Sequence, residues 1–384
     1  MERHATHRTS PDVGLNAGRS TTHDIRDEWA ITVRMPRAGR LPGMSRFTYG
    51  GQALIEGVLM RGRDAIAVAL RHPDGRIVYA TERLDSGMHG TRWSKLPFLR
   101  GLVVLYETLV MGTRWLVRSA NVQAEEDGVE IGKGGVALML AITLVLGIGV
   151  FFLLPLFIAT FTAGDVENDL VQHLIEGLVR VVIFLGYLVL ISRMPDIHRV
   201  FQYHGAEHMT IHALEHDDPL TVDAVRKYPT AHQRCGTEFL VVVIILSIFA
   251  FSLVGRQPPL IMVASRLLLI PVIAMIGYEI LRFGARYRRN PLVKVLMYPG
   301  ILVQMITTKR PTDDMIEVAI VSMQEALTAD GETVPENSEQ FEHDPMRLGP
   351  GTVEPVTEPG VSESAVSVPP QPTAASPGEP PSRS

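Results

Sequence analysis

The residues best suited to chemistry are histidines and a glutamate that lie between two apolar segments. His204, Glu207 and His208 form an H-x-x-E-H pattern, the order found in inverted zinc hydrolases. On a helix, which is expected to start at Pro195, histidines four residues apart can bind one metal ion through their ring nitrogens. A carboxylate between them can act as general base on a metal-bound water. The pattern therefore predicts a divalent-metal site, with zinc as the leading candidate and Glu207 as the catalytic base.

A third protein ligand is missing from this pattern. Glu215 falls on the same face of the expected helix, and His232 and Cys235 form a second metal-capable pair farther along the chain. The predicted ligands are therefore His204, His208 and one of Glu215, His232 or Cys235, and the sequence does not choose among the three. The competing interpretation is a cluster of histidines that only forms hydrogen bonds to backbone groups or senses pH.

Blocks of apolar residues indicate the class of protein. The chain has 384 residues, of which 46% are hydrophobic, and no charged residue lies between Lys133 and Asp165. Such a stretch is long enough for a helix to cross a hydrocarbon core of about 30 Å. We therefore expect an α-helical integral membrane protein with the lipid bilayer as a partner. Its four or so transmembrane helices are predicted at residues 134–161, 174–192, 239–255 and 260–281.

Two arginines, Arg180 and Arg266, fall within these predicted helices. Charges inside a membrane can mark functional sites. Each of the two, however, lies toward one end of its apolar segment, where a long side chain can reach the headgroups. We therefore favour such a snorkelling, non-functional position for both arginines.

Basic residues predict how the chain is oriented. The N-terminal segment 1–46, the His-rich loop 193–238 and the segment after the fourth apolar block are rich in arginine and lysine, whereas the connection between the first two blocks is acidic. The positive-inside rule then places both termini and the His-rich loop on the cytoplasmic side of the membrane. A single cysteine, Cys235, fits a reducing compartment.

A small folded domain is expected before the first apolar block. Residues 65–71 and 76–84 are rich in β-forming side chains, and the sequence His72-Pro73-Asp74-Gly75 between them is typical of a hairpin turn. Residues 47–95 are therefore predicted to form a small β-rich cytoplasmic domain that contains a hairpin. The polar residues Gln52 and Glu56 of this domain are expected to serve as structural hydrogen-bonding groups rather than in catalysis.

The remaining segments are predicted to be helical or disordered. Residues 96–120 are expected to form an amphipathic helix whose charges lie on one stripe. A fifth membrane span here would move the Arg-rich N-terminus outside, so we favour a helix that lies in the cytoplasmic interface or packs against the bundle. Residues 282–327 are expected to be a cytoplasmic helical segment. Residues 1–46 and the Pro-rich tail 328–384 have too few large apolar side chains to fold.

Four stretches of sequence resemble the YqhQ-like family. They are YGGQALIEGVLMRG, FQYHGAEHMTIHALE, LTVDAVRKYPTAHQRCGTEFL and the stretch from GYEILR to PGILVQMITTKRPTDDMIEVAI, and the resemblance covers about residues 47–327. It implies a bacterial multi-pass membrane protein with a domain of unknown function. It also implies a metal-dependent enzyme, the label commonly given to this family.

Three classes of function fit these features. The first is a metal-dependent hydrolase that acts at the cytoplasmic membrane face on a lipid-like or peptide substrate. The second is a non-enzymatic accessory or scaffold protein that binds other membrane proteins and whose histidine cluster is structural. A transporter is least favoured, because the apolar segments contain few charges and no broken repeat pair. The glycines of GGQALIEG match neither a P-loop nor a dinucleotide fingerprint, and we expect no nucleic-acid partner.

Overall fold

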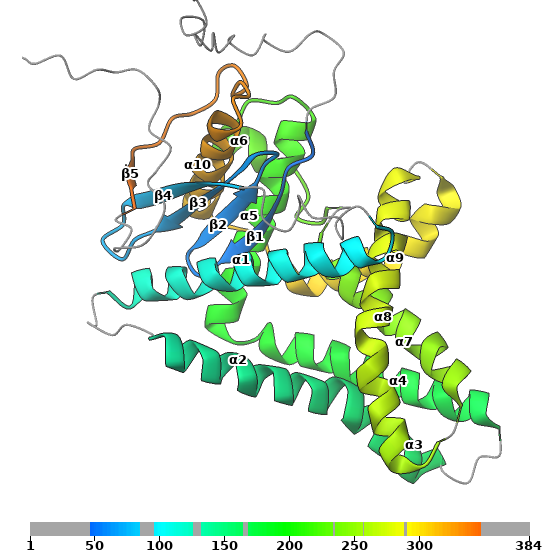
Figure 1. Cartoon of the computed structure of the whole chain (residues 1–384). Helices are drawn as coiled ribbons and strands as arrows, with labels where there is room; N and C mark the ends of the chain where they lie inside the picture. Colours follow the sequence, from blue (N-terminus) through cyan, green and yellow to red (C-terminus); the bar gives the residue numbers. More distant parts are fainter. Residues whose placement is uncertain are drawn as a thin grey trace, which may run out of the picture. The chain divides into compact units, whose positions relative to one another are not determined.

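The computed structural model describes residues 47–84, 96–125, 132–163, 168–232, 235–255, 257–287 and 290–346. This part of the chain is mostly helical and contains one small sheet (Figure 1). The predicted disordered segment 1–46 lies outside the described residues, and so do residues 347–384 of the predicted tail.

The sheet has five strands in the order β1-β2-β3-β4-β5. These are β1 (Gly50–Leu54), β2 (Gly57–Arg61), β3 (Ala65–Arg71), β4 (Ile77–Arg83) and β5 (His343–Pro345). The first four strands pair antiparallel in chain order, whereas β5 is parallel to β4. The predicted hairpin is present as β3 and β4, and the positive φ of Gly75 in its turn suits a glycine. Strands β1, β2 and β5 were not predicted from the sequence.

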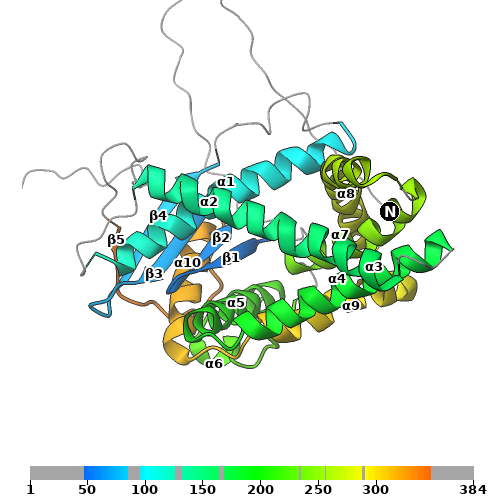
Figure 2. The same cartoon turned by 90° about the horizontal axis from the view of Figure 1, so that it is seen from below.

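Helices cover both faces of this sheet (Figures 1 and 2). Helices α5 (Pro195–Glu215) and α10 (Asp313–Ala329) pack on one face, and α1 (Leu99–Gln123) lies on the other. Because successive side chains of a strand point to opposite faces, both faces of β2 need apolar residues. The buried, apolar character of β2 and β3 follows from this two-sided burial.

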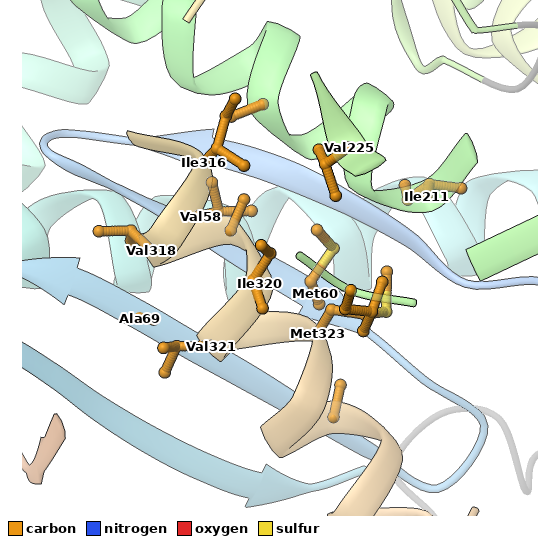
Figure 3. Packing of buried hydrophobic residues seen from close by; sticks show 14 of the residues in the cluster. Val58, Met60, Ala69, Ile211, Val225, Ile316, Val318, Ile320, Val321 and Met323 are labelled. Atoms are coloured by element: carbon orange, nitrogen blue, oxygen red, sulfur yellow. The ribbon is translucent and has the colours of Figure 1, made fainter. Parts of the chain in front are cut away.

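The core between the sheet and α10 is built from small and branched side chains (Figure 3). Val58 and Met60 of β2 pack with Ile320 and Met323 of α10, and all four are fully buried. Leu59, between Val58 and Met60, belongs instead to the cluster on the α1 side of the sheet. This alternation fixes the register of β2, because a slip of one residue would exchange the two faces.

Helix α1 corresponds to the amphipathic helix predicted at residues 96–120, and it packs against protein. Its Trp115 is buried in the second core cluster of the sheet. Its charged stripe forms ion pairs, since Arg114 pairs with Glu82 of β4 and Arg100 pairs with Glu279 of α8. Helix α1 thus packs against α8 and the sheet, which is one of the placements expected from the sequence.

Four helical stretches are long and apolar enough to cross a membrane, at residues 134–162, 171–191, 237–254 and 260–286. Each overlaps one of the four predicted segments. The first consists of α2 (Lys133–Ile148), a π-helical turn η3 (Gly149–Leu153) and α3 (Leu154–Ala163), and the others are α4 (Asp169–Ile191), α7 (Thr237–Val254) and α8 (Pro259–Arg286). Helix α4 contacts both α3 and α7, and α7 contacts α8.

Two shorter helices lie in segments that were predicted as the His-rich loop 193–238 and the cytoplasmic helical segment 282–327. Helix α6 (Val222–Val225) is capped by Thr221, whose hydroxyl accepts a hydrogen bond from the Ala224 N–H. Helix α9 (Pro291–Thr307) is capped by Asn290 and contacts α7. Helix α9 therefore connects the apolar helices to the segment that precedes α10.

The predicted snorkelling positions of Arg180 and Arg266 are wrong. The two residues are 2% and 0% exposed, and their guanidinium groups lie 2.7 and 2.9 Å from the Glu176 carboxylate. The reason is that Glu176 precedes Arg180 by one helical turn and offers an acceptor inside the bundle. An internal partner makes it unnecessary for either side chain to reach the headgroups.

The predicted disordered tail also begins too early, because residues 328–346 are part of the folded domain. Helix α10 ends at Ala329, and Asp330 is 3% exposed. Its carboxylate accepts hydrogen bonds from the Tyr49 hydroxyl and from the backbone N–H groups of Arg63, Asp64 and Ala65, at 2.7 to 3.1 Å. Asp330 thus holds its polar segment in place by accepting hydrogen bonds from the backbone N–H groups of the turn between β2 and β3, and not by burying apolar surface.

Replacing this carboxylate should weaken the domain. Asp330→Ala leaves three backbone N–H groups and the Tyr49 hydroxyl without their acceptor, so the free energy of unfolding should fall by about 3 kcal/mol. Urea unfolding followed by tryptophan fluorescence measures the change. Asp344→Ala removes an exposed ion pair with Arg76 and should cost less than about 1 kcal/mol. Equal effects of the two substitutions would contradict the role given to Asp330.

The attachment of β5 should depend on pH through His343. Its Nε2 lies 3.2 Å from the Glu325 carboxylate, and this contact raises the pKa of the His343 imidazole against the opposing effect of burial. Because the pKa is higher in the folded state, the stabilisation is fully present below about 6.5 and is lost as the pH rises through the raised value. Hydrogen exchange of the Met346 N–H, which donates to Tyr79, should accelerate over that range beyond its intrinsic pH dependence. The same acceleration in His343→Gln would assign it to another group.

Candidate metal centre

The H-x-x-E-H pattern lies on helix α5. The helix begins at Pro195, a residue suited to the first turn, and continues to Glu215 as the sequence predicts. Its second half, unlike its first, is almost entirely buried. Histidines and a glutamate that are buried in this way must find partners inside the protein.

Three potential ligands meet at the first half of this pattern. His204, His208 and Cys235 offer ligand atoms that all lie within 4.8 Å of one another. The His204 Nε2 lies 3.1 Å from the Cys235 Sγ, and the two imidazole rings have centroids 4.4 Å apart. The structure thus brings Cys235, one of the three candidate third ligands, to the histidine pair.

Backbone carbonyl groups orient both histidine rings. The Nδ1 of His204 lies 2.9 Å from the Thr307 carbonyl oxygen, and the Nδ1 of His208 lies 2.6 Å from the Thr230 carbonyl oxygen. A ring that donates its Nδ1 proton in this way presents an unprotonated Nε2. Metal-binding histidines in proteins usually have this second contact, because it fixes the tautomer and the ring plane.

Burial sets the protonation of the first group. It lowers the pKa of His208 well below its usual value, with His204 adding to the effect, so His208 is a neutral imidazole. It raises the pKa of the Cys235 thiol, although the Thr237 hydroxyl and N–H both donate to the Sγ. Neutral imidazole is the form that binds a metal, whereas the thiol must lose its proton to do so.

The other two candidate ligands belong to a second group. His212, Glu215 and His232 also offer ligand atoms within 4.8 Å of one another, and the His232 Nε2 lies 3.4 Å from the Glu215 carboxylate. His212 was not among the predicted ligands. The available signal was its position four residues after His208, which continues the spacing of the first pair.

Glu207 lies beside the first group, beneath the sheet. It is 4% exposed, and its Oε2 has no hydrogen-bond partner among the described residues. Burial raises the pKa of this carboxyl to about 8, against the opposing effects of His204 and of the Gly51 N–H, which donates to it. The glycine is needed at that position, because a Cβ on Gly51 would lie 3.0 Å from the Glu207 carboxyl carbon and 2.4 Å from the Leu59 carbonyl oxygen.

Residues far apart in the sequence hold the loop before α7, which carries His232 and Cys235. The side-chain amide of Gln304, which is fully buried in α9, accepts from the His232 N–H at 2.9 Å and donates to the His232 carbonyl at 3.0 Å. No local pattern in the sequence indicated this residue. The structural role expected of Glu56 agrees with its ion pair to Arg199 and its contact with the Tyr203 hydroxyl, both on α5.

A cavity of about 520 Å³ reaches Cys235 from the apolar helices. Its walls come from α7, α8 and α9, and most of the lining is apolar, as at Met297 and Ile301. Arg282 and Lys294 also line it, together with Tyr278. The cavity therefore combines an apolar wall with two cationic side chains and the Glu238 carboxyl, next to a potential metal ligand.

Comparisons with known proteins place the chain in a family. The model of the family described as "Protein of unknown function (DUF1385)" matches residues 96–329. The "Uncharacterized protein YqhQ" of Bacillus subtilis (strain 168) is 36% identical over 293 residues, which are 73% of this chain and 92% of that protein. No solved structure matches the chain. On the family match and the shared sequence, the chain belongs to the DUF1385 family, the YqhQ-like proteins of unknown function.

Proposed function

We propose that this protein is a metal-dependent hydrolase of the bacterial inner membrane that acts on a lipid-like substrate. The observation that carries the proposal is the meeting of His204, His208 and Cys235, with Glu207 near them and with Cys235 also lining an apolar cavity. We place this site at the cytoplasmic face, with both chain termini on the same side.

The apolar surface of the helices supports a position in the bilayer. Leu144 and Val145 of α2 are 64% and 69% exposed, and they lie in the most hydrophobic of the four long helices. Side chains exposed to this extent over a whole helix are stable in hydrocarbon and unfavourable in water. The basic residues of the segment between α4 and α7 then favour the cytoplasmic side for α5.

The donor atoms of the first group suit a zinc ion. Two imidazole nitrogens and one thiolate are ligands that zinc prefers, and catalytic zinc sites usually have three protein ligands with a fourth position open. The contacts of both Nδ1 atoms with backbone carbonyls hold the rings as such ligands require. We therefore assign His204, His208 and Cys235 as ligands, and His212, Glu215 and His232 as a second group able to hold a cation.

Glu207 is the residue that we assign to proton transfer. A divalent ion, when bound at such a site, lowers the pKa of water toward 7 and polarises a carbonyl or phosphoryl oxygen. Glu207 lies near His204, and its Oε2 has no hydrogen-bond partner among the described residues. A cation bound at the site would favour the ionised form of this carboxyl against the effect of burial, and in that form Glu207 would accept a proton from water and return it to a leaving group. The Gly51 N–H holds its other side in place.

The cavity favours a lipid-like substrate over a peptide. Its apolar walls between α7, α8 and α9 suit an acyl chain, and Arg282 and Lys294 suit an acidic headgroup. An extended peptide would need backbone hydrogen bonds from the walls of its site. Helices supply few such groups, because their own hydrogen bonds use them.

A non-enzymatic role is the second candidate, and the same hydrogen bonds favour it. His204, His208 and His212 each bind a backbone carbonyl of a neighbouring segment, at Thr307, Thr230 and Ala231. The rings therefore tie α5 to the loop before α7 and to the end of α9. In an accessory protein the histidine cluster would serve only to hold these segments together. The sheet domain would then bind another membrane protein.

Measuring bound metal distinguishes a metal-dependent hydrolase from an accessory protein whose histidines are structural. Detergent-purified protein should hold about one zinc per chain at the first group, and His204→Ala combined with His208→Ala should lose it. Elemental analysis of both proteins, with His216→Ala as a control for an exposed histidine outside the two groups, measures the difference. Equal metal content in the wild type and the double variant would remove the metal site.

Substitution of the proposed base tests catalysis. Glu207→Gln should reduce hydrolysis of bacterial phospholipids by about 10²–10⁴-fold, while metal content and thermal stability stay near the wild-type values. Product formation in nanodiscs, followed by mass spectrometry, measures turnover, and Glu336→Gln on the exposed surface is the matched control. Turnover at the wild-type rate in Glu207→Gln would remove Glu207 as the base, and a wild type without turnover would instead favour the accessory role.

A further inference from the structure

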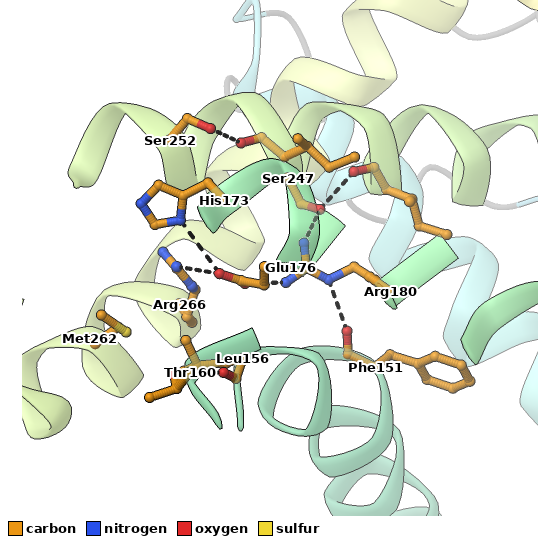
Figure 4. Close-up of polar contacts among 12 residues, drawn as sticks. Phe151, Leu156, Thr160, His173, Glu176, Arg180, Ser247, Ser252, Met262 and Arg266 are labelled. Carbon is orange, nitrogen blue, oxygen red and sulfur yellow. Dashed lines mark hydrogen bonds and ion pairs between the residues drawn. The ribbon is translucent and has the colours of Figure 1, made fainter. Parts of the chain in front are cut away.

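A second cluster of charged residues lies within the apolar helices, away from the metal centre (Figure 4). It contains His173, Glu176 and Arg180 of α4 and Arg266 of α8, and all four are at most 3% exposed. Glu176 is about 22 Å along α4 from its end at Ile191, the end that leads to α5. The cluster is therefore a separate site.

The Glu176 carboxylate is at the centre of the cluster and is shared. Its Oε1 accepts from the Arg180 Nη2 at 2.7 Å, and its Oε2 accepts from the Arg266 Nη2 at 2.9 Å. In Figure 4 the two guanidinium groups lie on opposite sides of the carboxylate, with the His173 ring on the Arg266 side. Both guanidinium groups also stack near the Phe251 ring, at 4.9 and 4.0 Å from its centroid.

Arg180 is fully engaged, and its contacts use an irregular part of the first apolar helix. Its Nη1 donates to the Ser247 hydroxyl at 2.9 Å, and its Nε donates to the Phe151 carbonyl at 3.0 Å. Phe151 lies in the π-helical turn η3, and such turns are rare and frequent at functional sites. The helical irregularity therefore provides an acceptor for Arg180, which joins α4 to η3 and α7.

Arg266 and His173 have hydrogen-bonding atoms to which no described residue forms a hydrogen bond. The Nε and Nη1 of Arg266 and both ring nitrogens of His173 have no hydrogen-bond partner among those residues, although the His173 Nδ1 lies 3.5 Å from Glu176. The cluster holds two guanidinium groups against one carboxylate. A buried positive charge without a counter-charge is costly in a medium of low polarity, so the cluster calls for an anion.

We propose that Arg266 and His173 bind an oxyanion, a phosphate or carboxylate group, inside the helix bundle. Arg266 supplies two N–H donors and the excess charge, and His173 supplies a third donor next to them. Arg266 lies about 10 Å along α8 from its first residue, Pro259. The end of the bundle where α8 begins is therefore the nearer side from which a lipid headgroup or a soluble anion would enter.

The experiment uses the full chain, purified in detergent and stripped of lipid. Phosphatidylglycerol and inorganic phosphate are added in separate series, and native mass spectrometry and thermal unfolding are recorded for each. We expect one Arg266-dependent anion to bind per chain, besides any lipid at the cavity lined by Arg282 and Lys294, and to raise the melting temperature by several degrees. A response to phosphatidylglycerol alone identifies a lipid headgroup, and a response to both identifies a site open to soluble anions.

Arg266→Met is the decisive variant, with Arg286→Met near the other end of α8 as its control. Arg266→Met leaves the Glu176–Arg180 pair neutral, so its melting temperature without anion should equal or exceed that of the wild type. Its affinity for the anion should fall at least tenfold, and Arg286→Met should bind as the wild type does. If Arg266→Met fails to fold, His173→Gln provides the same comparison. Undiminished binding in the folded variants, or no binding by the wild type, would overturn the proposal.

Discussion

The burial of polar side chains on helix α5 is the constraint on which the rest of the structure depends. The second half of this helix lies between the sheet and the segments that lead into and out of the apolar helices, and it carries His204, Glu207 and His208. Each buried ring must be paired, and each finds a backbone carbonyl or a thiol. The glycine at position 51 and the amide of Gln304 are then required by the same crowding.

This constraint also explains why the candidate site lies at the junction of two kinds of structure. Helix α5 follows α4 after a turn of only a few residues, and Cys235 stands directly before α7. The ligands are therefore fixed by helices that the apolar core anchors, and the sheet closes the site from the other side through Gly51. An arrangement of this kind gives a buried polar centre access to apolar surroundings through the cavity at Cys235.

Local periodicity allowed part of this to be predicted from the sequence. The four apolar helices, the β3–β4 hairpin and the helix that carries His204 and His208 depend on patterns within a single segment. The assignment of Cys235 to this pair, rather than Glu215 or His232, depends on the path of the chain between α5 and α7, which no local pattern encodes.

Charged and polar residues were the least predictable part for the same reason. Arg180 was expected at the headgroups because a charged side chain near the end of an apolar segment can reach water. Its actual partners, the Ser247 hydroxyl and the Phe151 carbonyl, come from other helices. Asp330 was placed in a disordered tail because its segment is polar, yet its partners are backbone groups more than 260 residues earlier in the chain. Partners so distant in sequence are visible only in the folded chain.

X-ray absorption at the zinc edge of the purified protein identifies the ligand atoms of the proposed metal centre. We expect one sulfur ligand at about 2.3 Å and at least two nitrogen ligands at about 2.0–2.1 Å, with the sulfur lost in Cys235→Ser. A zinc ion bound only by oxygen and nitrogen in the wild type, or a sulfur ligand that persists in Cys235→Ser, would contradict the assignment of His204, His208 and Cys235 as the metal centre.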